Sequence, residues 1–318
     1  MVDVSQLGHI GVLYGGYSSE REISLKSGSA IIKALTESGC RVTPIDVNTK
    51  VKEEIADLIK RSGIDVAFIA LHGAGGEDGV VQEILEKLKI PYTGSGVKAS
   101  QNALDKVLAQ EIFVKNKIPA ALSKAVSKKG KNNVEDLLKF FNGSPLVVKP
   151  SCEGSSIGIS FVKDKKDLPK ALESAFVFGP EVIVQRFIQG RELTVGILDD
   201  QALPIVEIKY NSEFFDFSTK YLKGGNEYLV PAPLPQNIAQ KVQTLALKAH
   251  QVLGCKDYSR VDVMLDEKMN PYVLEVNTIP GFTASSLLPK AAAKAGIDFN
   301  SLCLRLVKLA YGKNNKKK

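Results

Sequence analysis

The chain has 318 residues, which is more than one ordinary small domain needs and favours two or three domains. Hydrophobic residues make up 44% and charged residues 24%, the proportions of a globular protein in water, and the longest apolar runs are too short to span a bilayer. The net charge is +7, but four of these charges are lysines in the tail 313–318. We therefore expect no nucleic-acid and no membrane partner.

The N-terminus and the cysteines favour a cytoplasmic protein. The first residues, MVDVSQLGHIGVLYGG, lack the basic start of a secretory signal. Four cysteines are widely scattered and form no CxxC or CxxH pair: Cys40, Cys152, Cys255 and Cys303. This spacing indicates neither a disulfide framework nor a zinc site.

Strands and helices alternate along the first segment, residues 1–96. We expect strands at 9–16, 41–47 and 65–71 and helices at 20–39, 51–62 and 80–90. This alternation predicts a parallel sheet covered by helices, with ligands at the carboxyl ends of the strands. The loops at those ends, GGYSSE and HGAGGEDG, are the candidate binding loops, and the turn-rich PYTGSG ends the segment.

Two further segments follow, and we expect them to be separate domains at 97–188 and 189–318. The first of them begins with one long helix, 97–116, and continues with strands at 145–150, 159–163 and 181–188. The last segment is rich in strands and ends in helices at 236–253 and 289–311.

The stretch KPSCEGSSIG puts Lys149 at a strand end, followed by a loop of small residues. Such a loop lets backbone N–H groups approach phosphate oxygens closely, while the lysine supplies positive charge. A plain flexible hairpin turn is the alternative. No Walker A motif and no Rossmann GxGxxG motif occurs in the chain, so a nucleotide site here has another design.

The stretch RVDVMLDEKMNPYVLEVN, residues 260–277, predicts an antiparallel hairpin with its loop at 266–271. The register that buries most apolar side chains pairs Leu265 with Tyr272, Val263 with Leu274 and Val261 with Val276. On the reverse face it pairs two carboxylates, and it also pairs a guanidinium with an amide: Asp262 with Glu275 and Arg260 with Asn277.

Like charges opposite each other destabilise a sheet, by about 4 kcal/mol for two charges 4 Å apart at an effective dielectric constant of 20. Arg260 could offset this repulsion in a solvated surface hairpin. Alternatively, a hard divalent cation could be held by the carboxylate and amide oxygens, with open positions for phosphate.

Several other polar residues carry little information alone. Lys106 lies on a predicted helix, and Glu20 is most simply an acidic residue in the first turn of a helix. His72 ends a buried strand, where a binding role and a structural role are both open. Ser286 could merely begin a helix.

Taken together, the order of these features resembles the ATP-grasp superfamily. Eight motifs resemble the D-alanine–D-alanine ligase family in the family's order, over about residues 9–310: GGYSSEREISL, LHGAGGEDG, VVKPSCEGSSIG, RELTVGIL, TKYL, RVDVMLDE, EVNTIPGFT and SSLLP. The resemblance implies an α/β fold, in which an N-terminal parallel-sheet (pre-ATP-grasp) domain precedes a two-lobed α+β ATP-grasp fold.

The resemblance also implies an activity and its cofactors. The family joins two D-alanine molecules at the expense of ATP through a D-alanyl phosphate, for peptidoglycan precursor synthesis. It implies two Mg²⁺ ions, or Mn²⁺ in their place, held by Asp262, Glu275 and Asn277. A homodimer is implied as well.

By the same resemblance, other residues acquire roles. Those expected to bind ATP are Lys106, Lys149, Ser156, Gln185, Ile188 and Glu192. Those expected to hold the D-alanine substrates are His72, Lys220, Ser286 and Leu287. The catalytic residues implied are Glu20 for the first ammonium group, Ser155 and Tyr221 linked to Glu20, and Arg260 with the Gly281 N–H for the oxyanion.

Four residues bear on specificity. Tyr221 favours an amine as the second nucleophile, because relatives that make D-alanyl-D-lactate replace this tyrosine. The chain has Gln185 and Arg186 where the family often has Glu-Lys, and Phe215 where a tyrosine is common. Two rival functions stay open: a ligase with D-lactate or D-serine as acceptor, and a non-catalytic ATP-binding protein.

Overall fold

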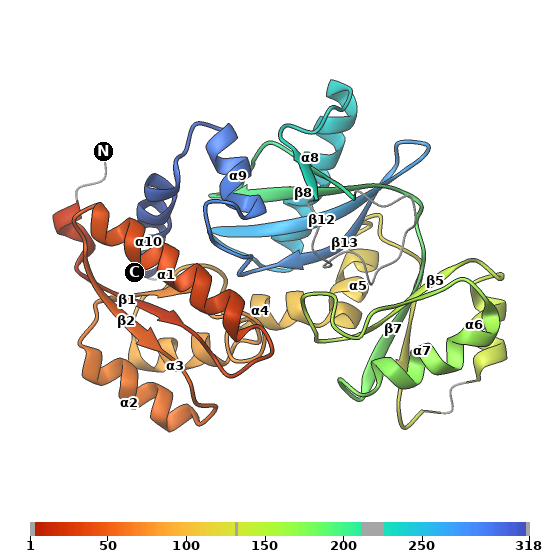
Figure 1. Cartoon of the computed structure of the whole chain (residues 1–318), viewed down its shortest axis with the longest axis horizontal. Helices are drawn as coiled ribbons and strands as arrows, with labels where there is room; N and C mark the ends of the chain where they lie inside the picture. The colour runs from red at the N-terminus through yellow and green to blue at the C-terminus, as the bar shows by residue number, and fades with distance from the viewer. Residues whose placement is uncertain (1–3, 131–132, 211–225, 316–318) are drawn as a thin grey trace.

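The computed structural model describes residues 4–130, 133–210 and 226–315. Within these ranges the chain forms three sheets, with strand orders β2-β1-β3, β4-β7-β5-β6 and β11-β10-β8-β12-β13, and β9 pairs with β8. The N-terminal sheet and its helices lie on one side of Figure 1 and the four-stranded sheet on the other, with the largest sheet between them. This is the expected α/β fold class.

The N-terminal sheet is parallel, as the alternation predicted. Its strands are β1 (His9–Tyr14), β2 (Arg41–Asp46) and β3 (Val66–Ile69), and its helices are α1 (Arg21–Glu37), α2 (Lys52–Ser62) and α3 (Val80–Leu88). The side chains of β1 and β3 alternate between two cores, so both faces are apolar. Helix α10 (Phe299–Asn315) covers one face with α1, while α2 and α3 cover the other.

The helix expected at 97–116 is two helices, α4 (Val97–Leu104) and α5 (Lys106–Lys115). Asp105 between them has an extended backbone, with φ −78° and ψ 104°, and its carboxylate accepts the N–H groups of Val107 and Leu108. An aspartate can cap a new helix in this way, and its side chain therefore ends one helix and begins the next. The helical periodicity continues across this break, which is why the sequence did not predict it.

The four-stranded sheet consists of β4 (Ser123–Ser127), β5 (Leu146–Pro150), β6 (Ser160–Val162) and β7 (Glu181–Arg186). Its helices are α6 (Val134–Phe140) and α7 (Leu168–Ala175), and they share a core with one face of the sheet. The sequence missed β4 and α6. Strand β4 is a mostly exposed edge strand without apolar alternation, and α6 has only seven residues.

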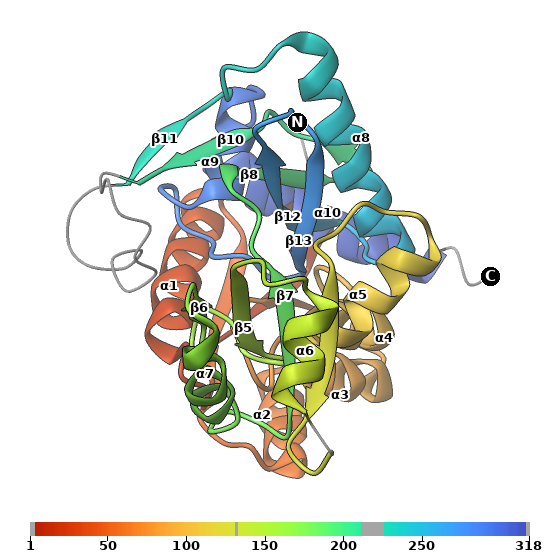
Figure 2. The same ribbon diagram turned by 90° about the vertical axis from the view of Figure 1, so that its right-hand side faces the viewer.

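The largest sheet is antiparallel throughout. It contains β8 (Gly190–Leu198), β9 (Gln201–Ala202), β10 (Val206–Lys209), β11 (Glu227–Leu229), β12 (Tyr258–Asp266) and β13 (Pro271–Asn277). Helix α8 (Gln236–Val252) and the pair α4–α5 share a core with its apolar face. In Figures 1 and 2, strands β12 and β13 lie above β5 and β7, so the second face of this sheet is turned toward the four-stranded sheet.

The hairpin register is partly as predicted. Asp262 lies opposite Glu275, Arg260 opposite Asn277 and Val261 opposite Val276. The predicted pairs Val263–Leu274 and Leu265–Tyr272 are wrong, because the register shifts beyond Asp262 and the actual partners are Val273 and Pro271. One extra residue on β13, a β-bulge, buries Val273 and turns Leu274 to the same face as Glu275.

The helix expected at 289–311 is also two helices, α9 (Leu287–Lys294) and α10. Gly296 between them has φ +84°, a left-handed conformation that favours glycine, and the Asp298 carboxylate accepts the Ser301 N–H at 2.8 Å to begin α10. The break lets α9 pack on β8 and α10 pack on α1. Among the helices of the described residues, none is both long and apolar enough to cross a bilayer.

We predict that Asp105→Ala lowers the free energy of unfolding by about 1–2 kcal/mol, because α5 loses its cap. The Asp105 carboxylate also accepts the hydroxyl of Ser151 at 2.5 Å, which ties α5 to the loop after β5. Asn133→Ala is the matched control, since Asn133 caps α6 at an exposed site with one bond of 2.9 Å. Urea denaturation should show the larger loss for Asp105→Ala; equal losses would contradict this assignment.

Candidate active site

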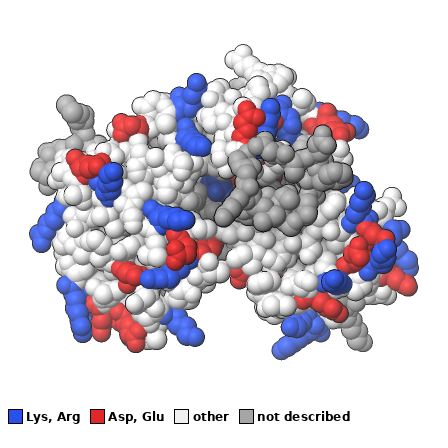
Figure 3. All heavy atoms as spheres, in the orientation of Figure 1, with Lys and Arg blue, Asp and Glu red and all other residues white. Residues whose placement is uncertain are grey.

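A cavity of about 370 Å³ lies between the two antiparallel sheets, at the carboxyl ends of the N-terminal strands. Most of the predicted site residues form its wall: Glu20, His72, Lys149, Ser155, Ser156, Gln185, Ile188, Glu192, Arg260, Asp262, Glu275, Asn277, Gly281 and Leu287. Lys220 and Tyr221, like Phe215, lie outside the described residues. Figure 3 shows the surface hollowed between the two halves of the molecule, with positive and negative side chains interspersed on both.

Two predicted residues lie just behind the wall. The Lys106 ammonium donates to the carbonyl oxygen of Glu153 at 2.5 Å and lies 3.9 Å from Glu275 Oε2, so it links the loop after β5 to β13. The Ser286 hydroxyl accepts the N–H of Thr283 at 3.0 Å at the start of α9. A methyl group built on Gly281 would lie 3.5 Å from Ser286 Oγ, so these two residues are neighbours.

The facing carboxylates are compensated by cations of the chain itself. Arg260 donates from Nε and Nη2 to the two oxygens of Asp262, at 2.9 and 2.6 Å, and the Thr194 hydroxyl donates to Asp262 Oδ1 at 2.7 Å. Lys106 lies beside Glu275. The pairing of Arg260 with Asp262 that the sequence left as one alternative is therefore present.

A third oxygen completes this group. Asn277 Oδ1 accepts the N–H of Ile279 at 3.0 Å, and Asn277 lines the cavity beside Glu275. Among the described residues no cluster of three His, Cys, Asp or Glu side chains is placed to hold a metal ion. A cation held here would therefore need the Asn277 amide oxygen as well as the two carboxylates.

The wall of the cavity also carries a second pair of carboxylates, Glu20 and Glu77. The Ser155 hydroxyl donates a hydrogen bond to Glu20, which connects the loop after β5 to the N-terminal sheet. Burial, and next the charge of Glu77, raise the pKa of Glu20 above its ordinary value, although Ser155 and His72 act in the other direction. A bound ammonium group would relieve this repulsion.

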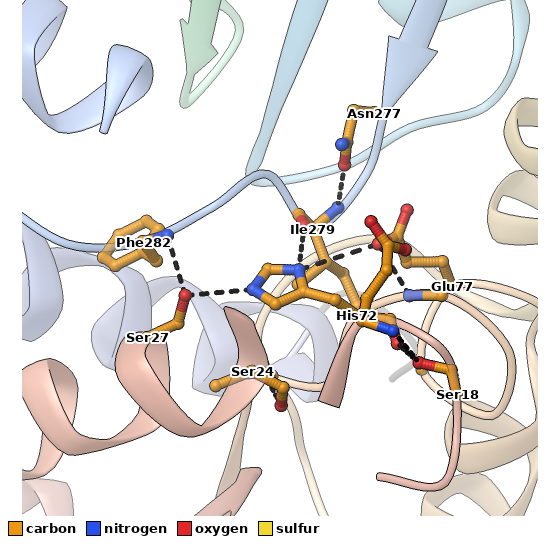
Figure 4. A network of polar contacts seen from close by, with 12 residues as sticks. Ser18, Ser24, Ser27, His72, Glu77, Asn277, Ile279 and Phe282 are labelled. Carbon is orange, nitrogen blue, oxygen red and sulfur yellow. Dashed lines mark hydrogen bonds and ion pairs between the residues drawn. The ribbon is translucent and has the colours of Figure 1, made fainter. Parts of the chain in front are cut away.

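His72 joins the N-terminal sheet to the loop after β13, as Figure 4 shows. Its Nδ1 donates to the carbonyl oxygen of Ile279 at 2.9 Å, since a carbonyl can only accept, and the hydroxyl of Ser27 donates to its Nε2 at 3.0 Å. Ser27 also accepts the N–H of Phe282 at 3.1 Å. These contacts give His72 a structural role at the edge of the cavity, and Ser27, which the sequence did not single out, completes it.

Much of the remaining wall is apolar, and sequence reasoning missed most of this apolar part. Val147 shares a face with Lys149, and Met264 shares a face with Asp262, so the period-two alternation of a strand could have found both. Leu274 could not be found in this way, because the bulge moves it to the cavity face out of the period-two alternation. Gln185 lies opposite Val147 on the neighbouring strand, so this end of the cavity is apolar with one buried amide.

The fold and the cavity together define the class. A parallel N-terminal domain followed by two antiparallel sheets that enclose a charged cavity is the ATP-grasp architecture. Two sequence-family models, described as the C-terminus and the N-terminus of D-ala D-ala ligase, match residues 112–308 and residues 9–60 and 48–95.

Curated relatives and solved structures agree. The chain is 47% identical over 299 residues to a D-alanine–D-alanine ligase of Geobacter sulfurreducens, covering 94% of this chain and 92% of the relative. It is 45% identical to that of Geotalea uraniireducens, with 97% of both chains covered. The structure of the Bacillus anthracis ligase complexed with ATP matches with a TM-score of 0.87 and 35% identity, over 98% of this chain and 100% of that one. The chain belongs to the D-alanine–D-alanine ligase family.

We predict that Ser27→Ala lowers the free energy of unfolding by about 1–3 kcal/mol, because the buried N–H of Phe282 loses its acceptor and His72 loses a donor. Ser38→Ala is the control on the same helix, because the Ser38 hydroxyl donates only to the carbonyl of Ala34 at the half-buried helix end. Chemical denaturation of both variants measures the difference. A cost for Ser27→Ala no larger than that for Ser38→Ala would show that the network is not stabilising.

Proposed function

We propose that this protein joins two D-alanine molecules to D-alanyl-D-alanine with hydrolysis of ATP to ADP and phosphate, and that it does so in the cytoplasm for peptidoglycan precursor synthesis. One observation carries the proposal: a single cavity is lined by the facing carboxylates Asp262 and Glu275, by Lys149, and by a second carboxylate pair whose half-buried member Glu20 has a raised pKa. The facing carboxylates and the lysine suit the metal-bound phosphates of ATP, and the second carboxylate pair suits the ammonium group of an amino acid.

The nucleotide is proposed to lie along the two antiparallel sheets. Lys149 and Lys106 would neutralise phosphate charge, and the small residues around Ser156 would let backbone N–H groups approach the phosphate oxygens. Ser155 and Ser156 lie in a turn of this loop and have left-handed backbones, with φ 49° and 58°. The ribose hydroxyls would donate to Glu192, and the base would enter the apolar end beside Gln185 and Ile188.

Magnesium ions fit the residues at the charged end. Asp262, Glu275 and Asn277 offer two carboxylates and one amide oxygen on the cavity face of adjacent strands, and Mg²⁺ prefers such hard oxygen ligands. We propose that these three residues hold two Mg²⁺ ions, or Mn²⁺, together with ATP phosphates. When bound, the metal would neutralise the charge that develops on the transferred phosphoryl group.

In the first step, a carboxylate oxygen of D-alanine attacks the γ-phosphorus, the bond to the β-phosphate oxygen breaks, and ADP leaves with the electron pair. Glu20 is proposed to hold the ammonium group of this D-alanine, with Ser155 fixing the carboxylate of Glu20 and His72 supporting the adjacent loop. Glu20 and the charged end lie in one cavity, which would bring substrate and phosphate together without a large movement of the chain.

In the second step, the unprotonated amine of another D-alanine attacks the carbonyl carbon of the acyl phosphate. The bond from this carbon to the phosphate oxygen breaks, and phosphate leaves with the proton that the nitrogen loses. Arg260 and the N–H of Gly281 are proposed to stabilise the tetrahedral oxyanion. Ser286 with Lys220, beside Leu287, would hold the second carboxylate. Tyr221 is proposed to hydrogen-bond in the chain from Ser155 to Glu20 and to exclude water from the acyl phosphate.

The finer organisation of the protein is also proposed. We assign residues 1–96 to a substrate-binding domain, 97–188 to the central ATP-grasp lobe and 189–318 to the C-terminal lobe, which carries the metal ligands. We further propose a homodimer, which light scattering with size exclusion would test. Limited proteolysis would test the domain boundaries.

The activity is tested by phosphate release from ATP and Mg²⁺ with D-alanine, L-alanine or D-alanine plus D-lactate, followed by product mass. We expect release with D-alanine alone, a D-alanyl-D-alanine mass, and loss of turnover when EDTA removes the metal. A depsipeptide mass would favour the D-lactate ligase instead. No phosphate release under any of these conditions would leave a non-catalytic ATP-binding protein.

We predict opposite effects of Glu20→Gln on activity and stability. The KM for D-alanine should rise by at least about tenfold, because a charge-assisted bond to the ammonium is lost, while the KM for ATP stays unchanged. The unliganded variant should melt at a higher temperature than the wild type at pH 7, because the raised pKa of Glu20 means that its ionised form opposes folding.

The pH dependence has a definite sign. The stability gain of Glu20→Gln should be complete above the raised pKa of Glu20 and should vanish below its ordinary value of 4.5, where the carboxyl group is protonated in both states. Thermal melts from pH 8 to pH 4 measure it. A gain that persists at pH 4 would mean that the effect does not come from the charge of Glu20.

A further inference from the structure

Two buried glutamines form a chain of hydrogen bonds behind the apolar end of the cavity. Gln110, on α5, donates from Nε2 to the carbonyl oxygen of Ala121 at 2.8 Å. Gln185, on β7, donates from its own Nε2 to Gln110 Oε1 at 3.4 Å. Only 7% of Gln110 and 4% of Gln185 is exposed, and of the two only Gln185 lines the cavity.

This chain fixes the direction of both amides. The carbonyl of Ala121 can only accept a hydrogen bond, so the NH₂ group of Gln110 faces it and the oxygen of Gln110 faces Gln185. A reversed Gln185 amide would bring two carbonyl oxygens together in a buried site. The bond of 3.4 Å is long, but this electrostatic preference acts at that distance. Gln185 Oε1 is therefore turned away from Gln110, and Gln185 is the member of the pair that lines the cavity.

An amide needs such support where a carboxylate would not. A carboxylate accepts hydrogen bonds in either orientation. A glutamine offers an acceptor in one orientation and a donor in the other. Whether Gln185 presents a donor or an acceptor to a ligand therefore depends on a neighbour that fixes its amide, and Gln110 is that neighbour.

We propose that Gln110 is a positioning residue that sets the base preference of the nucleotide site. By holding Gln185 as an acceptor, it selects a purine with an amino group at position 6 over a purine with a carbonyl group there. The inference rests on the proposed function, in which the base of ATP enters the apolar end of the cavity. A site that must hydrogen-bond one polar group rejects an analogue that leaves a buried acceptor unpaired.

The test compares ATP with ITP, which have similar size and differ at position 6 and in the hydrogen of the adjacent ring nitrogen. The D-alanine-dependent kcat/KM is measured for both nucleotides with the wild type and with Gln110→Met, which keeps side-chain length and removes the amide. We expect the wild type to prefer ATP by at least about tenfold. The variant should lose most of this preference, because Gln185 can then turn its NH₂ group toward the carbonyl of ITP.

Two further variants separate positioning from a general loss of structure. Gln243→Met is the matched control, since Gln243 on α8 donates to the carbonyl of Leu203 at 2.9 Å and does not line the cavity. It should leave the ATP/ITP ratio unchanged. Adding Gln185→Glu to Gln110→Met should restore the preference for ATP, because a carboxylate needs no orienting neighbour. A purely structural role of Gln110 would lower both kcat/KM values together and would show no such rescue.

The outcomes also separate this inference from the proposed ligase activity. Calorimetric Kd values for ADP and IDP give the same base preference without turnover, so they apply even if the wild type releases no phosphate with D-alanine. That failure would count against the ligase alone. An unchanged ATP/ITP ratio in folded Gln110→Met would overturn the inference. If Gln110→Met does not fold, the wild type and Gln185→Glu still test the inference. Equal Kd values of the wild type for ADP and IDP would overturn it. A clear preference of the wild type for ADP, together with the same preference in Gln185→Glu, would support it.

Discussion

The repulsion between Asp262 and Glu275 is the constraint on which the site depends. Burial of the apolar face of β12 and β13 brings these carboxylates opposite each other, and the bulge beyond Asp262 keeps that pair while it adjusts the rest of the register. Two cations of the chain compensate this repulsion: Arg260, on the same strand as Asp262, and Lys106 at the start of α5. Two cations and two anions then stand at one end of the cavity, which suits a polyanionic ligand that arrives with metal ions.

Strand alternation decides which side chains line the cavity and which lie in the core. Side chains of β5 and β7 that face α6 and α7 are apolar and buried, whereas those one residue along, such as Lys149 and Gln185, face the cavity. On β8 and β12 the same alternation turns Glu192, Asp262 and Met264 toward the cavity. The cavity has an apolar part beside Gln185 and a charged part beside Asp262 and Glu275. A nucleotide matches this arrangement, because its base is apolar and its phosphates are charged.

Hydrogen bonds behind the wall of the cavity hold the parts of the site in position. Ser27 and His72 tie α1 and the strand end of β3 to the loop that carries Gly281, and Asp105 ties α5 to the loop after β5. Buried bonds of this kind specify one arrangement, because each broken bond leaves an unsatisfied group. They hold together parts of the site that come from distant parts of the sequence.

The sequence by itself determined the parallel N-terminal sheet and the family, and it named about half of the residues that line the cavity, because these features depend on local periodicity and on motifs of adjacent residues. The opposition of Asp262 to Glu275 also followed from alternation alone. Only the tertiary structure decided the bulge at Leu274, the breaks at Asp105 and Gly296, and the partners of His72 and Gln185. The partners of His72 and Gln185 lie far apart in the chain, by up to the 207 positions that separate His72 from Ile279, so no local pattern encodes them. The breaks have local signals in Asp105 and Gly296, but the different packing of the flanking helices decides that the chain bends there.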